Sequence, residues 1–160
     1  MAIAAGAARG LSHLHDHEKM VHGNLTSTNI LLDSQLIPKL SDFGLSRLMT
    51  QSANSAVIAT AGTLGYRAPE LTKMKKATPK SDVYSFGIVL LELLTGKTSS
   101  SRKHGKASSS SPMDLPDWVA SLVKKNEWSH EIFDAELVRS VDGIQPRDED
   151  LIACLQLAMA

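Results

Sequence analysis

The feature that most constrains this chain is an apolar run, VYSFGIVLLELLT, at residues 83–95. Ser81 precedes the run as a suitable N-cap, and Asp82 places negative charge in the first turn, where the helix dipole favours it. Gly96 follows as the kind of residue that ends a helix. Because the predicted helix is apolar nearly all round, it has no face suited to water, and we expect it in the middle of a domain.

Three other segments have the apolar spacing of helices. Residues 2–16 place apolar side chains three or four positions apart, and a second helix is predicted to begin around Pro116. A third begins near Asp148 and is still running at the last residue. Together with the apolar run, these segments predict a mainly helical fold.

Strand signals are confined to one part of the chain. Residues 29–33 and 37–40 are short apolar runs on either side of a turn, and they predict a small β-hairpin. Residues 43–66 have little periodicity and predict a long loop. Residues 97–113 are serine-rich and basic and predict a flexible insertion. The expected fold class is therefore mainly α with one small β-hairpin.

Composition excludes several classes of protein. The chain has 160 residues, which suffice for one domain with a buried core. Its 17 basic and 17 acidic residues cancel, which removes the electrostatic case for nucleic acid or an anionic membrane as the main partner. The longest apolar stretch is well short of the roughly 20 residues that a bilayer span needs. The single cysteine, Cys154, cannot form an internal disulfide, and we expect a reduced thiol in an intracellular protein.

Four motifs follow one another along the chain. They read HGNLTSTN at residues 22–29, DFG at 42–44, GTLGYR at 62–67 and APE at 68–70. In this order they resemble the larger, C-terminal lobe of a plant receptor-like protein kinase, in which the family has H-R-D-L-x-x-x-N, D-F-G and A-P-E. The sequence is most similar to leucine-rich-repeat receptor-like kinases of the meristem type, a group often described as inactive.

The resemblance covers nearly the whole chain and implies a partial protein kinase domain over residues 1–160. The smaller N-terminal lobe, which carries the glycine-rich loop and the lysine that hold ATP, has no counterpart before Met1. We therefore expect a C-lobe that is truncated at both ends and holds no cofactor by itself. Mg-ATP is implied by the family resemblance only.

Two residues match the metal-binding positions of the family. Asp42 resembles the aspartate that binds Mg²⁺, a hard cation that takes carboxylate and phosphate oxygens. Asn29 resembles the asparagine that binds the second metal through its amide oxygen. The resemblance implies that both metal ligands are kept, for use only in a complete nucleotide cleft.

Three neighbouring residues depart from the family pattern. Asn24 stands where active relatives have the aspartate that accepts or orients the substrate hydroxyl, and an amide is not a useful base. Thr26 replaces a lysine that would touch the transferred phosphate, and Gly23 replaces an arginine that pairs with a phosphorylated activation loop. Three such changes within four residues favour a pseudokinase.

Four other residues are expected in supporting roles. His22 opens the first motif and is assigned a structural role, and Asp82 resembles the aspartate that accepts hydrogen bonds from the backbone of the catalytic loop. Thr63 would lie beside Asn24. Glu70 pairs in the family with an arginine beyond the final helix, and we expect it to lack that partner here, because the two arginines just before this helix are poor substitutes.

Three hypotheses follow for the function. The favoured one is a pseudokinase C-lobe that binds or scaffolds protein partners in a receptor signalling complex, at the cytoplasmic face of the plasma membrane, or in the cytoplasm if expressed as this fragment. A serine/threonine kinase that is active when joined to an upstream ATP-binding lobe is the second. A truncated product without activity is the third. A phosphotransfer assay with the upstream lobe present distinguishes the first two.

Overall fold

The structure, a computed structural model, describes residues 1–45, 64–72, 76–99, 114–124, 132–139 and 147–160. The chain divides into two compact units, residues 1–86 and residues 87–160. The prediction of a mainly helical chain with one small hairpin is confirmed for the described residues. None of the helices described is both long and apolar enough to cross a bilayer. Most of the predicted loop and of the serine-rich insertion lies outside the described residues.

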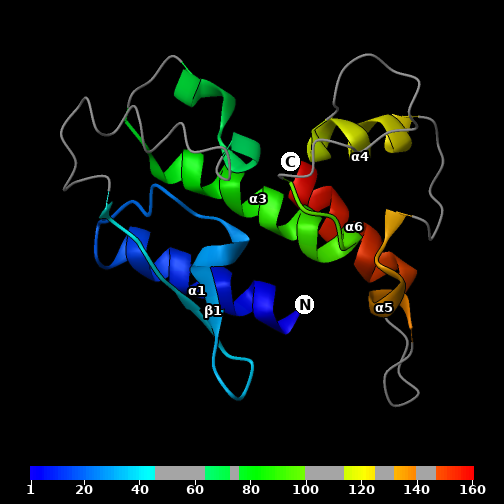
Figure 1. The fold of residues 1–160 in the computed structure, drawn as a ribbon, viewed down its shortest axis with the longest axis horizontal. Coiled ribbons are helices and arrows are strands. Elements are labelled where there is room, and N and C mark those ends of the chain that lie inside the picture. Colours follow the sequence, from blue (N-terminus) through cyan, green and yellow to red (C-terminus); the bar gives the residue numbers. More distant parts are fainter. Residues whose placement is uncertain (46–63, 73–75, 100–113, 125–131, 140–146) are drawn as a thin grey trace. The chain divides into compact units, whose positions relative to one another are not determined.

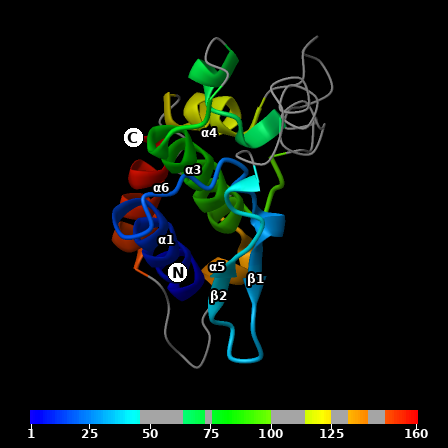
Figure 2. The ribbon, with the colours of Figure 1, turned by 90° about the vertical axis from the view of Figure 1, so that its left-hand side faces the viewer.

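The first unit begins with helix α1, Ala2–Asp16, followed by a two-stranded antiparallel sheet of β1, Ile30–Leu32, and β2, Pro38–Leu40 (Figures 1 and 2). The register pairs Ile30 with Leu40 and Leu32 with Pro38. The turn between the strands is closed by Asp33, whose carboxylate accepts hydrogen bonds from two backbone amides within the turn. Both the helix and the hairpin therefore form where the apolar pattern predicted them.

Helix α1 packs against strand β2 at its glycine positions. A Cβ atom at Gly6 would overlap the ring of Pro38. A Cβ atom at Gly10 would lie 3.4 Å from Cδ1 of Leu40, a tight contact with a flexible side chain. The close approach of helix and strand thus depends on Gly6, and much less on Gly10.

We expect opposite results from alanine at these two glycines. Alanine within a helix is favoured over glycine by about 1 kcal/mol, so Gly10→Ala should leave the free energy of unfolding unchanged or raise it by up to that amount. Gly6→Ala should lower it by about 1–3 kcal/mol, because the rigid proline ring cannot make room. Urea unfolding of the two variants measures both values. Equal effects at the two positions would contradict this description of the contact.

Helix α3, Pro79–Thr95, begins two residues earlier than Ser81, so the prediction of Ser81 as the N-cap was wrong. Pro79 takes the first helical position, which suits its fixed backbone angle and missing N–H. Thr78 precedes it, and its hydroxyl accepts a hydrogen bond from the amide of Ser81 at 3.2 Å while the Ser81 hydroxyl accepts one from the amide of Thr78 at 2.9 Å. This reciprocal pair has the logic of a capping box. At the other end Gly96 has a φ of +65°, as a helix-ending glycine does.

The second unit is built around the C-terminal part of α3 (Figure 1). It contains helices α4, Leu115–Lys124, α5, Ala135–Val138, and α6, Asp148–Met159. Its core consists of buried aliphatic side chains from α3, α4 and α6 together with Ile132, namely Leu91, Leu94, Leu115, Val119, Ile132, Leu151 and Leu155. The predicted helices near Pro116 and Asp148 are confirmed. The short helix α5 was not predicted; the side chain of Asp134 caps it by accepting from the amide of Glu136.

Candidate functional site

The segment from His22 to Asn29 is held by buried side chains. His22 and Leu25 are fully buried, and Thr26 is nearly so. The segment ends in a short 3₁₀ helix, Ser27–Asn29, that leads directly into β1. This loop, residues 22–29, carries most of the site residues expected from the sequence, and we call it the motif loop.

Asp82 joins the motif loop to the first turn of α3. Its buried carboxylate accepts hydrogen bonds from the amides of His22, at 2.7 Å, and Gly23, at 2.8 Å. A third contact comes from α1, where Nε2 of His15 lies 2.9 Å from Oδ2 of Asp82. Hydrogen bonds to an ionised acceptor are short and strong, and three of them offset the cost of burying the carboxylate. Asp82 therefore fixes where the motif loop begins.

His22 is buried as a neutral ring. Desolvation by burial lowers the pKa of His22 from its usual 6.5, although the nearby carboxylate of Asp82 opposes this shift. Its Nδ1 lies 3.4 Å from the amide nitrogen of Asn24, which donates to it. Its ring meets the ring of Phe43 edge to face, with centroids 6.3 Å apart. Nε2 has no hydrogen-bond partner among the described residues.

The lowered pKa of His22 predicts a loss of stability at acid pH. As pH falls below about 6.5, an unfolded chain binds a proton at this ring before the folded chain does, so protonation favours unfolding. The free energy of unfolding should therefore have its highest value above pH 6.5, and it should decrease as the pH falls below 6.5. Urea unfolding between pH 5 and pH 7.5 measures this slope. The variant His22→Phe, which cannot titrate, should show a shallower slope, and an unchanged slope would contradict the assignment.

Asn24 and Asn29 are linked through the backbone. Nδ2 of Asn29 donates to the carbonyl oxygen of Asn24 at 2.8 Å, which leaves Oδ1 of Asn29 free to accept or to bind a cation. Within the described part of the chain, no carboxylate is hydrogen-bonded to the side chain of Asn24. The motif loop thus holds the amide of Asn24 at the position where the resemblance implies a catalytic carboxylate.

Hydroxyl groups form the side-chain contacts of the motif loop between residues 26 and 28. Oγ1 of Thr26 lies 2.8 Å from Oγ1 of Thr28, and Oγ of Ser27 lies 2.8 Å from the phenolic oxygen of Tyr66. Tyr66, in the 3₁₀ helix Leu64–Tyr66, is itself buried, and its carbonyl oxygen accepts from the hydroxyl of Ser85 at 2.8 Å. This link between the third motif and the motif loop was not predicted from the sequence.

Asp42 lies on a segment bonded to the motif loop on both sides. The amide of Ser41 donates to the carbonyl of Asn29 at 2.9 Å, and the amide of Gly44 donates to the carbonyl of His22 at 3.1 Å. Asp42 itself is exposed and has a φ of +58°, which an aspartate tolerates better than most residues do. Its carboxylate and the free Oδ1 of Asn29 are both oxygen donors. Such a pair suits Mg²⁺, which takes one or two protein ligands together with substrate phosphates.

The remaining site residues are not gathered at the motif loop. Thr63 lies outside the described residues. Glu70, in the 3₁₀ helix Pro69–Thr72, makes no hydrogen bond or ion pair within the described part of the chain. Arg139 and Arg147, the two arginines before the final helix, are bonded to Glu136 and Asp150 respectively, at 2.6 Å and 3.0 Å. Each of these two arginines is thus engaged with an acidic residue three positions away in sequence.

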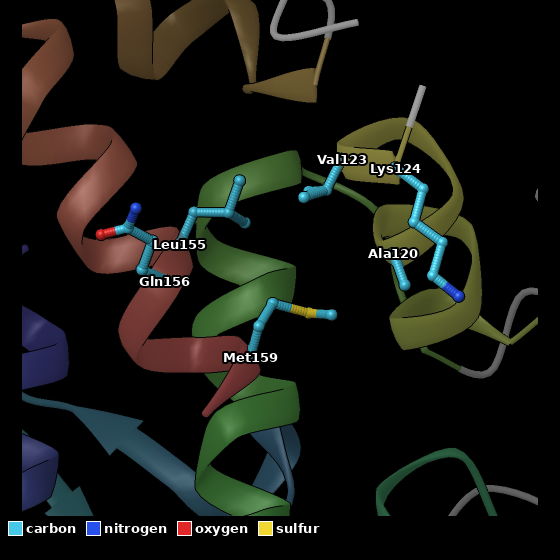
Figure 3. Close-up of a pocket in the computed structure, with 6 residues that line it drawn as sticks. All are labelled: Ala120, Val123, Lys124, Leu155, Gln156 and Met159. Carbon is cyan, nitrogen blue, oxygen red and sulfur yellow. The ribbon is translucent and has the colours of Figure 1, made fainter. Parts of the chain in front are cut away.

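An apolar pocket of about 170 Å³ lies in the second unit, between α4 and α6 (Figure 3). It is lined by Ala120, Val123, Lys124, Leu155, Gln156 and Met159. It shares no residue with the motif loop, and its lining contains no histidine, carboxylate or cysteine. No cluster of three potential metal ligands among histidine, cysteine and acidic residues occurs in the described residues.

Comparisons with known proteins agree with the sequence motifs. The protein kinase domain family matches residues 1–146. A probable leucine-rich repeat receptor-like protein kinase of Arabidopsis thaliana, IMK3, is 52% identical over 159 residues, which is 99% of this chain and 19% of the relative. The chain thus spans about a fifth of the length of this curated relative.

Two solved structures show the same fold. The kinase domain of maize SIRK1 (sucrose-induced receptor kinase 1), bound to AMP-PNP, is 36% identical with a TM-score of 0.76, over 99% of this chain and 50% of that one. The pseudokinase domain of BIR2, an immune regulator, is 32% identical with a TM-score of 0.71, over 99% of this chain and 43% of that one. Because the chain is similar both to a nucleotide-bound kinase and to a pseudokinase, these similarities do not distinguish an active kinase from a pseudokinase. The residues of the site must distinguish them.

Proposed function

The chain belongs to the protein kinase domain family, and from this premise we propose that it is a pseudokinase-type C-lobe of a plant receptor-like kinase. It would act in signalling by binding or scaffolding protein partners, without transferring phosphate. The observation that carries this proposal is the amide of Asn24, which stands at the position of the base on a loop whose backbone is hydrogen-bonded at His22, Gly23 and Asn24. The motif loop thus has an ordered backbone, but it lacks the carboxylate that would act as the base.

An amide cannot replace a carboxylate as a base. A general base typically contributes a factor of about 10²–10⁴ to the rate of the step that it assists. The amide of Asn24 has nearly the shape of a carboxylate but no charge and no useful basicity. Thr26, at the position of a lysine, turns its hydroxyl to Thr28 and offers no positive charge to a phosphate. The transition state for phosphoryl transfer would lose both contributions.

Metal binding is the part of the family's chemistry that this chain retains in its residues. Asn29 and Asp42 would hold Mg²⁺ in a complete cleft, and the ion would neutralise charge on the phosphates of a bound nucleotide. These two residues alone do not accept a proton from a substrate. We therefore assign them to nucleotide or metal binding and not to catalysis.

A second candidate function is that of a working kinase, completed by an upstream ATP-binding lobe. The bond from Asn29 to the carbonyl of Asn24 supports it, because this bond leaves the metal-binding oxygen of Asn29 available. Phosphoryl transfer also depends mainly on positioning and charge, so it does not strictly require a strong base. We rank this candidate below the pseudokinase because three positions in the same loop, 23, 24 and 26, lack the charged residues of active relatives.

The relatives suggest where such a protein acts. IMK3 is described as a receptor-like kinase and BIR2 as an immune regulator. By analogy, we propose protein partners within a receptor complex and a location on the cytoplasmic side of the plasma membrane.

The test of this function separates binding from phosphotransfer in living cells. Plant cells lacking the parent protein would receive either the intact gene or the gene with Asp42→Ala, which removes the metal-binding carboxylate. Signalling that depends on binding alone should be restored equally by both. Loss of signalling with Asp42→Ala, at equal protein level, would favour the working kinase, and the exposed variant Glu136→Ala serves as the matched control.

A further inference from the structure

The backbone of Gly23 is in a conformation that most residues avoid. Its φ is +77°, in the left-handed region, which glycine enters freely because it lacks a Cβ atom. Gly23 lies directly before Asn24 in the motif loop. Its amide is also one of the two backbone groups that donate to Asp82, at 2.8 Å.

The geometry points to Gly23 as a positioning residue for the motif loop. We infer that Gly23 allows the backbone to turn from the Asp82 carboxylate toward Asn24 without strain, and that an arginine at this position, as in related active kinases, would have to adopt the same turn at a cost. The change from arginine to glycine would then be more than the loss of a charge that binds phosphate. It would also make the shape of the motif loop easier to keep.

The bonding around Gly23 supports this role. The amides of His22 and Gly23 converge on the two oxygens of one carboxylate, so both must keep their directions at the same time. Two residues later the chain must also bring Leu25 into the core, where it is 1% exposed. With both ends fixed, the turn at residue 23 cannot relax by moving its neighbours.

Three residues other than glycine in the described part of the chain also have left-handed backbone conformations, and such conformations have an energetic cost. Lys19, Leu36 and Asp42 also have positive φ values, between +50° and +60°. Left-handed conformations cost an ordinary residue of this kind roughly 1–2 kcal/mol, that is, a factor of about 5–30 in the ratio of folded to unfolded chain, and less for asparagine or aspartate. Gly23 avoids this cost at the position nearest to the amide of Asn24. The inference holds whether or not the motif loop transfers phosphate.

The role of Gly23 affects which substitutions should restore activity. A variant that returns the charged residues at positions 24 and 26 should keep Gly23. Adding Gly23→Arg as well should strain the backbone that positions residue 24.

The test compares Gly23→Ala, Gly23→Arg and Gly23→Asn in the whole chain. Alanine and arginine should each lower the folded-to-unfolded ratio by about 5–30-fold in urea unfolding, and asparagine should recover a large part of this loss. Hydrogen exchange followed by NMR should show reduced protection at the amides of residues 22 and 23, relative to amides in the middle of α3. A uniform loss of stability would leave that ratio of protection unchanged.

Two results would overturn the inference. One is a stability within twofold of the original for both alanine and arginine, which would show that residue 23 carries no backbone constraint. The other is a clear difference between alanine and arginine, because these share the backbone cost and differ in charge and size. Recovery by asparagine, with protection restored at residues 22 and 23, is the result that supports it.

Discussion

Replacing Asp82 by alanine should lower the free energy of unfolding by about 3–5 kcal/mol, the largest stability effect that we expect from a single polar residue of this chain. The side chain is 2% exposed, and its two oxygens accept from the amides of His22 and Gly23 and contact His15. Alanine would leave the buried amide of His22 and the part-buried groups of Gly23 and His15 without this acceptor. Urea unfolding monitored by circular dichroism measures the loss.

The matched control for Asp82 is Asp150→Ala. Asp150 is also an aspartate in the first turn of a helix, α6, but it is exposed and paired with Arg147 on the surface. Exposed pairs contribute about 0–1 kcal/mol, so its removal should change little. Because Asp82→Ala can fail to fold, Asp82→Asn provides a milder variant that keeps one acceptor oxygen and should lose less. Equal effects at positions 82 and 150 would contradict the role of Asp82 in holding the motif loop.

The largest effect on activity should come from Asn24→Asp combined with Thr26→Lys, in the protein joined to an upstream ATP-binding lobe. The carboxylate would provide the missing proton acceptor and the lysine a positive charge near the transferred phosphate, each at a position where the backbone is already in place. We expect phosphotransfer to rise by at least about 100-fold over the unaltered protein. Transfer of labelled phosphate from Mg-ATP to a generic protein substrate measures it.

A control variant identifies the source of any restored activity. Adding Asp42→Asn to the restored protein should abolish transfer, because it replaces the metal-binding carboxylate by an uncharged amide of nearly the same shape. If the restored protein stays at background while it folds and binds nucleotide normally, residues 24 and 26 are not what limits the chemistry.

Much of the fold was predictable because it depends on local patterns. Helices α1, α4 and α6 have an apolar stripe at the spacing of a helix, and the hairpin has a clear turn between two apolar runs. The start of α3 was predicted too late because Ser81 and Asp82 are typical of a helix N-terminus. The preceding Thr78-Pro79 pair is also a strong start signal, and the helix begins there. The prediction that α3 has no face suited to water and lies in the middle of a domain was only partly right, since Val83 is 59% exposed and Leu93 is 38% exposed. When a helix is apolar on all sides, its sequence does not show which side faces the core and which side is exposed.

The site was predictable as a set of positions and, through the family resemblance, in the contact of Asp82 with the backbone of the motif loop, but its other contacts were not predicted. The motifs identified Asn24, Asn29 and Asp42, and the chain places the last two on segments joined by a hydrogen bond from Ser41 to Asn29. The contact of His15 with Asp82 spans 67 positions, and that of Ser27 with Tyr66 spans 39. No local pattern encodes contacts over such separations. The left-handed backbone of Gly23 was also missed, because the sequence shows only that a glycine is present.

The motif loop is held in place, while the amide of Asn24 that it carries cannot accept a proton. A decisive test is a single-turnover phosphotransfer experiment on the unaltered protein joined to an upstream ATP-binding lobe, with excess Mg-ATP and a protein substrate. Our account predicts no transfer above that of the same protein carrying Asp42→Asn. Transfer that depends on Mg-ATP, and that Asp42→Asn removes, would show that the site works without a carboxylate at position 24 and would contradict the account.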